Sequence, residues 1–187
     1  MKSHSLRTRR LALFGISAAL CLAVQLMPRP PNVEFTSFFT FTVGVMCGVL
    51  DGAFFGCFVM FVNGFLSPYG FAGLNMPFQM FGMAIAGVLG GVYRSLIPKQ
   101  IGPARFCVET AIVGALIALV FDLVTNVGVG FQLVLSGVSF PFAMLTAMAY
   151  GVFFSVIHIF SNTVVFGVLT VPSMKTLNSL VRGKKIG

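Results

Sequence analysis

Seven polar side chains stand within or beside long apolar stretches of the sequence, where polar groups are rare. Asp122 can accept hydrogen bonds or pair with a cation, and His158 can donate or accept according to its tautomer. His158 and Asn162 are four residues apart, so on a helix they share one face. Polar groups of these types orient a small molecule in an otherwise apolar pocket. The set is Asn63, Asn75, Gln79, Asp122, Asn126, His158 and Asn162.

The sequence contains few of the residue patterns that catalysis or metal binding requires. An enzyme needs a nucleophile beside a base, or a metal site. Ser136 and His158 could form such a pair, but the sequence has no H-E-x-x-H motif, phosphate-binding loop or acidic metal pair. We predict a protein that is not an enzyme, with no cofactor of its own and neither a disulfide nor a metal site. The four cysteines all lie in apolar stretches without ligand spacing: Cys21, Cys47, Cys57 and Cys107.

The composition indicates that lipid surrounds this chain. Of its 187 residues, 57% are hydrophobic and 9% are charged, whereas about a quarter of a soluble chain is charged. The net charge of +8 comes from short basic clusters between apolar stretches. Such clusters are typical of the loops of membrane proteins, and they exclude nucleic acid as the expected partner.

Six apolar stretches are candidate membrane spans, and together they leave room only for loops in a single membrane domain, 1–187. The expected fold is an all-α six-transmembrane-helix bundle. The second and third stretches are separated by Asp51 and Gly52, which predicts a tight helical hairpin turning there. The last stretch begins near 141 and is longer than the membrane core, so its spanning part is placed at 150–172. The spans are 11–27, 35–50, 52–66, 76–95, 106–126 and 150–172.

The basic residues predict the orientation. Eleven of the 12 Lys and Arg residues precede the first span, surround the connection between the fourth and fifth, or follow the sixth. Only Arg29 falls on the other side. The positive-inside rule therefore places both termini in the cytoplasm. The alternative, a cleaved signal peptide, lacks an A-x-A site before Pro28 and would leave five spans.

Counting depth from these anchors places the polar set in the outer half of the bundle. The inner half holds little beyond Glu109 and the charges at helix ends. We therefore predict a ligand pocket that opens outward, with Asp122 as its anion and Arg29 and Glu34 at its mouth. The loops around it are 29–34, 67–75 and a long connection, 127–140. A structural alternative stays open for each residue. Asn126 and Asn63 could each cap a helix end, and His158 could hydrogen-bond a neighbouring helix for stability.

Small residues recur every four positions in several spans, which makes flat ridges suited to close helix packing. Internal packing is the expected role of most of them. The first helix carries the ridge Gly15, Ala19 and Ala23. The other ridges are Gly44, Gly48, Gly52 and Gly56; Gly82, Ala86 and Gly90; and Ala143, Ala147 and Gly151.

The chain resembles the substrate-binding S components of energy-coupling factor (ECF) transporters. The likeness covers almost the whole chain and rests on its size, its six spans, its cytoplasmic termini and its Gly-rich second and third spans. The motifs that carry it are Ala19-Leu-Cys-Leu-Ala23, Asn75-Met-Pro-Phe-Gln79, Asp122-Leu-Val-Thr-Asn126 and His158-Ile-Phe-Ser-Asn162.

The resemblance implies a subunit of an ABC importer in a prokaryotic cell membrane. Its partners would be a transmembrane coupling protein and two cytoplasmic ATPases. Ala19 and Ala23 would dock on the coupling protein, with Gly15 extending that face. Its ligand would be a vitamin or a cofactor precursor bound in the outward cavity. Riboflavin, pantothenate, a cobalamin-like compound and a nucleobase-derived precursor all stay open. The implied ligand contacts are Asn75, Gln79, Asp122, Asn126, His158 and Asn162.

Two other functions stay open from the residues alone. A self-sufficient oligomeric transporter or channel would use Asp122 and His158 as an ion or proton relay. It would also need polar residues through the inner half, and the sequence offers little there beyond Glu109. A structural membrane subunit would bind nothing at the outer polar set.

Overall fold

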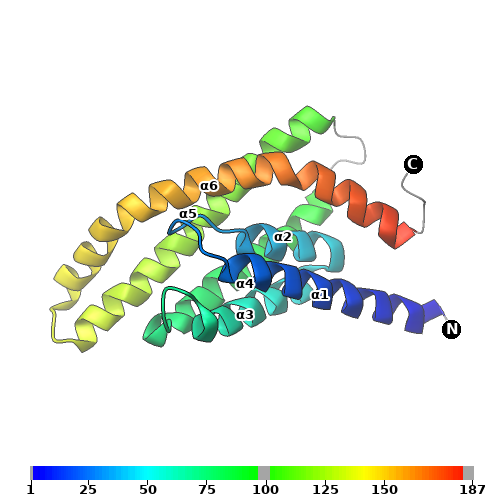
Figure 1. Ribbon diagram of the computed structural model, residues 1–187. Coiled ribbons are helices and arrows are strands. Elements are labelled where there is room, and N and C mark those ends of the chain that lie inside the picture. Colours follow the sequence, from blue (N-terminus) through cyan, green and yellow to red (C-terminus); the bar gives the residue numbers. More distant parts are fainter. Residues whose placement is uncertain (1, 97–101, 183–187) are drawn as a thin grey trace.

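The described residues, 2–96 and 102–182 of a computed structural model, form an all-helical protein with no β-strand among them (Figure 1). The α1–α2, α3–α4 and α5–α6 connections lie toward one end of the molecule, and the start of α1 and the end of α6 lie at the other. Lys99, Lys184 and Lys185, which helped to set the expected orientation, lie outside the described residues. The elements are α1 (Lys2–Leu26), α2 (Thr36–Cys47), α3 (Val49–Leu66), a 3₁₀ turn η1 (Gly73–Asn75), α4 (Met76–Leu96), α5 (Pro103–Leu135) and α6 (Phe140–Arg182).

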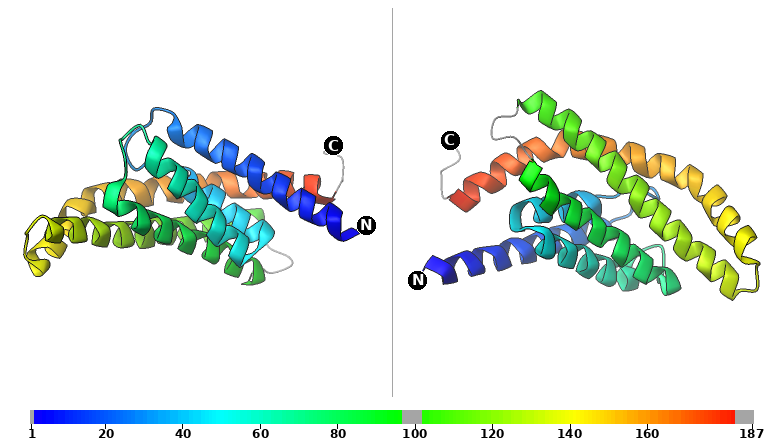
Figure 2. Two further views of the ribbon diagram at one scale, coloured as in Figure 1. Left: turned by 90° about the horizontal axis from the view of Figure 1, so that it is seen from below. Right: turned by 180° about the vertical axis from the view of Figure 1, so that it is seen from behind.

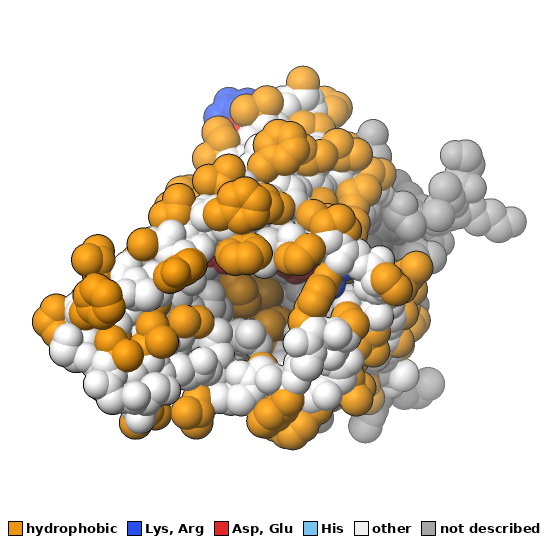
Figure 3. All heavy atoms as spheres, turned by 60° about the vertical axis from the view of Figure 1, so that its left-hand side comes forward, with side chains coloured by type: hydrophobic (Ala, Val, Ile, Leu, Met, Phe, Trp, Pro, Cys, Tyr) orange, Lys and Arg blue, Asp and Glu red, His pale blue; other side chains and the backbone are white. Residues whose placement is uncertain are grey.

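In the part of the chain that the structure describes, four helical stretches are long and apolar enough to cross a membrane. They are Val49–Leu66, Gly73–Leu96, Pro103–Leu135 and Phe140–Ser173, with mean hydropathy from 1.3 to 2.2. Their outward side chains are apolar as well: Phe54, Leu145 and Phe153 are each about two-thirds exposed. Figure 3 shows hydrophobic side chains spread over the visible surface. The chain is thus a helical, multi-pass membrane protein, as its composition predicts, while the count of six spans stays a prediction.

The last two helices are longer than the sequence analysis predicts. The fifth span was expected to end at Asn126, but α5 continues to Leu135, so the predicted long connection 127–140 is four residues, 136–139. Asn126 therefore caps no helix end. The expectation was wrong because residues 127–135 are mostly apolar, and glycines within them do not end a helix that lipid surrounds. The two helices lie side by side (Figure 1).

Two other helix ends differ from expectation. The last span was expected to end by Pro172, but this proline lies inside α6, which runs to Arg182. Proline is tolerated in helices of membrane proteins because neighbouring groups satisfy the backbone atoms that it frees. At the other end of the chain, α1 begins at Lys2, so the basic segment before the first expected span is helical too.

Close contacts between glycines hold α2, α3 and α4 together. A Cβ atom added to Gly87 would collide with the carbonyl group of Gly52, and one added to Gly44 would collide with the carbonyl group of Gly87. This confirms internal packing for Gly44 and Gly52. The hairpin turns at Gly48, whose φ of 112° suits glycine, whereas the predicted turn residue Asp51 lies in the first turn of α3. The turn is therefore three residues earlier than expected.

We expect Gly87→Ala to lower the free energy of unfolding by about 1–3 kcal/mol or more. The new methyl group would meet the Gly52 carbonyl group, which is backbone and cannot rotate away. Gly15→Ala is the matched control, since a Cβ atom at that helical glycine has nothing within 4 Å. Thermal unfolding in mild detergent measures both variants. Equal stability of the two would contradict the close α3–α4 packing.

The first helix packs through one face only, at the side of the bundle (Figure 2). Ala18, Cys21 and Gln25 are buried on that face. Phe14 stacks edge-on against Phe55, with ring centroids 5.1 Å apart. The exposed residues of α1 include the three members of the small-residue ridge, Gly15, Ala19 and Ala23.

Candidate ligand-binding pocket

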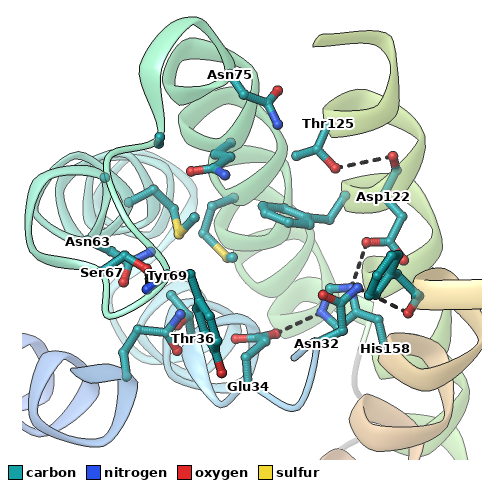
Figure 4. A pocket seen from close by; sticks show the side chains of 18 of the residues that line it. Asn32, Glu34, Thr36, Asn63, Ser67, Tyr69, Asn75, Asp122, Thr125 and His158 are labelled. Atoms are coloured by element: carbon teal, nitrogen blue, oxygen red, sulfur yellow. Dashed lines mark hydrogen bonds and ion pairs between the residues drawn. The ribbon is translucent and has the colours of Figure 1, made fainter. Parts of the chain in front are cut away.

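A cavity of about 400 Å³ lies between α3, α4, α5 and α6, and the α1–α2 and α3–α4 connections complete its wall. Figure 4 shows its polar side chains converging from these elements. The surface of the molecule is hollowed at the face drawn in Figure 3, and acidic side chains are visible there. Cavities of this size hold small molecules. The residues of the predicted polar set that line it are Asn63, Asn75, Gln79, Asp122, Asn126 and His158.

His158 bridges two carboxylates in the wall of the cavity. Its Nδ1 lies 2.8 Å from Asp122 Oδ1, and its Nε2 lies 3.1 Å from Glu34 Oε1. Both ring nitrogens therefore face acceptors, an arrangement that a doubly protonated imidazolium satisfies by donating twice. The imidazole is 2% exposed. This triad ties the α1–α2 connection, α5 and α6 together at one point.

Glu34 lies deeper than the sequence suggests. It was expected at the mouth, but it is 8% exposed and its Oε2 accepts a hydrogen bond of 2.9 Å from the Ser37 backbone at the start of α2. The positive end of the helix dipole favours an anion there. Burial alone raises the pKa of Glu34, but hydrogen bonds with His158 and Ser37 and the charge of His158 lower it to about 2. Glu34 is thus a second anion of the pocket.

Asn162 is the one predicted contact that does not line the cavity. It is fully buried behind the wall, where its Nδ2 donates to Glu34 Oε1 at 3.2 Å and to the His158 carbonyl oxygen at 3.3 Å. Asn162 therefore supports the triad of Glu34, His158 and Asp122.

The wall formed by α3, η1 and α4 carries amide groups. Asn63 is 7% exposed, and the side-chain oxygens of Asn63, Asn75 and Gln79 are buried without a hydrogen-bond partner among the described residues. Asp122 Oδ2 is also buried and has no hydrogen-bond partner among the described residues. A buried acceptor without a partner costs about 1–3 kcal/mol, so the oxygens of Asn63, Gln79 and Asp122 are suited to donors on a ligand.

Glycines make room for two amide side chains of the pocket, those of Asn75 and Asn126. A Cβ atom at Gly128 would collide with the side chain of Asn75, and one at Gly151 would collide with that of Asn126. Both amides therefore pack directly on the backbones of α5 and α6. The ridge glycine Gly151 serves the pocket as well as helix packing.

The sequence analysis placed the loops 29–34 and 67–75 around the pocket, but it did not assign their side chains to the wall. Arg29 lines the cavity, with its guanidinium 5.5 Å from the centroid of the Tyr69 ring, and the Tyr69 hydroxyl donates to the Arg29 carbonyl oxygen. Asn32, at a φ of 60°, donates from Nδ2 to the Phe154 carbonyl oxygen at 3.0 Å. As the only basic residue of the predicted outer side, Arg29 was expected at the mouth of the pocket rather than in its wall. Other lining residues missed are Gln25, Thr36, Ser67 and Thr125.

No protein-family model, curated protein or solved structure matches this chain. The geometry of the pocket determines what the pocket can do chemically. It can surround a small molecule, accept hydrogen bonds through buried oxygens and offer charges of both signs. Among the described residues, no group of three or more His, Cys, Asp or Glu residues could hold a metal ion.

Proposed function

We propose that this protein is the substrate-binding membrane subunit of an ECF-type ABC importer, which captures a vitamin or related micronutrient. One observation carries the proposal: a cavity of about 400 Å³ combines partnerless buried oxygens with a fixed ionic triad. The resemblance of the sequence to S components agrees with a pocket made by the later helices and the connections.

The proposed topology has six spans with both termini in the cytoplasm of a prokaryotic cell. Three connections lie toward the end of the molecule opposite the termini (Figure 1). Two of these connections, α1–α2 and α3–α4, also line the cavity. If the termini are cytoplasmic, the pocket belongs to the outer half of the membrane and receives its ligand from outside.

Release of the ligand inside the cell would depend on partners, because the chain has no ATP-binding motif. The proposed partners are a transmembrane coupling protein and two cytoplasmic ATPases. In support, Gly15, Ala19 and Ala23 are exposed along α1, and no atom lies within 4 Å of a Cβ added to Gly15. A second helix could approach α1 closely along this ridge.

A self-sufficient channel or transporter is the other proposal that the sequence left open. A relay through Asp122 and His158 would need to continue toward the end that carries the termini. On that side, Ile117 precedes Asp122 on α5 and Phe166 follows His158 on α6, and both are 2% exposed or less in the apolar core. Glu109 lies beyond them and is paired with Arg105 at 2.7 Å. The described core thus favours a closed binding site over a conducting path.

Native mass spectrometry of the protein, purified in mild detergent from its own host, tests the proposal. We expect one small molecule per chain in the vitamin mass range, and a complex that contains two ATP-hydrolysing subunits. Denaturing the protein should release the small molecule for identification. A homo-oligomer without ligand or ATPases, reproduced in several detergents, would contradict the proposal and favour the self-sufficient transporter.

A further inference from the structure

We propose that the ligand of this pocket carries a single carboxylate, which Arg29 binds. The inference rests on the proposed function, that the pocket binds a small molecule, and adds the chemical class of that molecule.

The two acidic side chains of the pocket each have an ionic partner, whereas Arg29 has none within the described ranges. Glu34 and Asp122 both lie against His158, at 3.1 and 2.8 Å. Arg29 forms no ion pair with any residue that the structure describes. Its guanidinium Nε and Nη1 atoms are buried and have no hydrogen-bond partner in the described part of the chain. An unpaired cation at a membrane pocket is costly, and a ligand anion would compensate it.

The surroundings of Arg29 suit a planar anion. The guanidinium group lies over the Tyr69 ring at 5.5 Å, which holds its position by a cation–π contact. The Tyr69 hydroxyl also donates to the Arg29 carbonyl oxygen, so the α3–α4 connection fixes both ends of this residue. A guanidinium group offers parallel N–H donors that match the two oxygens of a carboxylate.

The opposite side of the cavity suits the remainder of such a ligand. Tyr69 and Asp122 lie on opposite sides of the pocket in Figure 4. Asp122 Oδ2 and the amide oxygen of Gln79 are acceptors without partners among the described residues, so they favour N–H groups. Phe121 adds an apolar side chain to the lining of the pocket. The geometry thus fits a flat heterocycle with N–H donors at one end and one carboxylate at the other.

Matched pairs of acids and neutral analogues test this inference. The protein is placed in nanodiscs of phosphatidylcholine alone, so that no anionic lipid headgroup can occupy the site. Thermal unfolding is then measured against nicotinate and nicotinamide, pantothenate and panthenol, and biotin and biotinamide. We expect at least one acid to stabilise the protein and to bind about tenfold or more tightly than its neutral analogue.

Two substitutions of Arg29 connect that preference to the residue. Arg29→Gln should remove the preference for the acid, and Arg29→Lys should keep part of it because the charge stays while the paired donors are lost. Arg105→Gln is the matched control, because Arg105 is exposed, pairs with Glu109 and does not line the cavity. Its acid preference should equal that of the unchanged protein.

The inference is overturned if no acid stabilises the protein, if the neutral analogues bind as tightly as the acids, or if Arg29→Gln keeps the preference. A neutral small molecule recovered stoichiometrically from the purified protein would overturn the inference but leave the proposed function in place. A protein that neither carries a small molecule from its host nor responds to either member of any pair would overturn both.

Discussion

Replacing His158 with leucine should lower the free energy of unfolding by about 3–5 kcal/mol, the largest loss of stability that we expect from one side chain in this protein. The imidazole contacts Asp122 at 2.8 Å and Glu34 at 3.1 Å. Leucine would leave both carboxylates buried without the group between them. Unfolding in mixed micelles with increasing dodecyl sulfate at neutral pH measures the change.

The expected loss is large because the triad is enclosed. Glu34 is 8% exposed and Asp122 is 6% exposed, so water cannot replace the lost hydrogen bonds without local opening. Two like charges in a medium of low dielectric constant also repel each other strongly. The three residues come from the α1–α2 connection, α5 and α6, so the loss should loosen the way these elements are held together.

A triple substitution separates charge from packing. Adding Glu34→Gln and Asp122→Asn to His158→Leu removes both uncompensated charges and should recover much of the lost stability, since replacing all partners of an ionic group is far less costly than removing one. If His158→Leu alone were as stable as the unchanged protein, the ionic triad would be refuted. A triple variant less stable than His158→Leu would assign the loss to packing.

Counting depth predicted that Asp122 and His158 lie in one cluster, but it did not predict the hydrogen bond between them. The two residues are 36 positions apart, yet the sequence places both in the outer half of neighbouring antiparallel helices, where polar groups must find one another. Glu34 was misplaced because it lies in a connection without helical periodicity. How deep a connection folds depends on tertiary contacts, here the hydrogen bond to Ser37 and the His158 ring.

Helix ends were the weakest part of the sequence prediction, for a physical reason. Asn126 and Pro172 are polar or helix-breaking residues, and in water each would favour a helix end. In this protein the helix continues through both, because an apolar environment leaves backbone groups no water to bind. Asn126 instead packs on Gly151, a contact between α5 and α6 that spacing cannot reveal.

The glycine ridges were predicted to pack, but their partners were not. Gly44 and Gly52 meet Gly87 on α4, whereas Gly48, on the same four-residue spacing, forms the turn. Spacing identifies a flat helix face, and only the fold decides what covers it. On α1 the ridge of Gly15, Ala19 and Ala23 is covered by none of the described helices, which separates it from the internal ridges.

The exposed ridge on α1 is the basis of the second large effect that we expect, an effect on the binding of partner proteins. Ala19→Phe should reduce the amount of coupling protein and ATPases that co-purify with the chain by about tenfold or more, because a ring on the ridge would keep a partner helix away. Ala19 is exposed, so the variant should fold and bind its ligand as before. Quantitative mass spectrometry of the purified complex gives both the partner ratio and the ligand ratio.

Ala149→Phe is the matched control, since it places the same ring at an exposed alanine on α6. Both variants enlarge the surface that faces lipid, so a general effect of a ring on membrane insertion would lower the amount of co-purified partners in both alike.

Loss of partners in Ala19→Phe alone, with ligand still bound, would assign the ridge of α1 to docking and the pocket to capture. Undiminished partners in Ala19→Phe would show that docking uses another face, whereas a loss of ligand together with partners would mean that α1 shapes the pocket. The two sites are therefore separable by experiment because the pocket side of α1, represented by buried Gln25, and the exposed ridge are different faces of one helix.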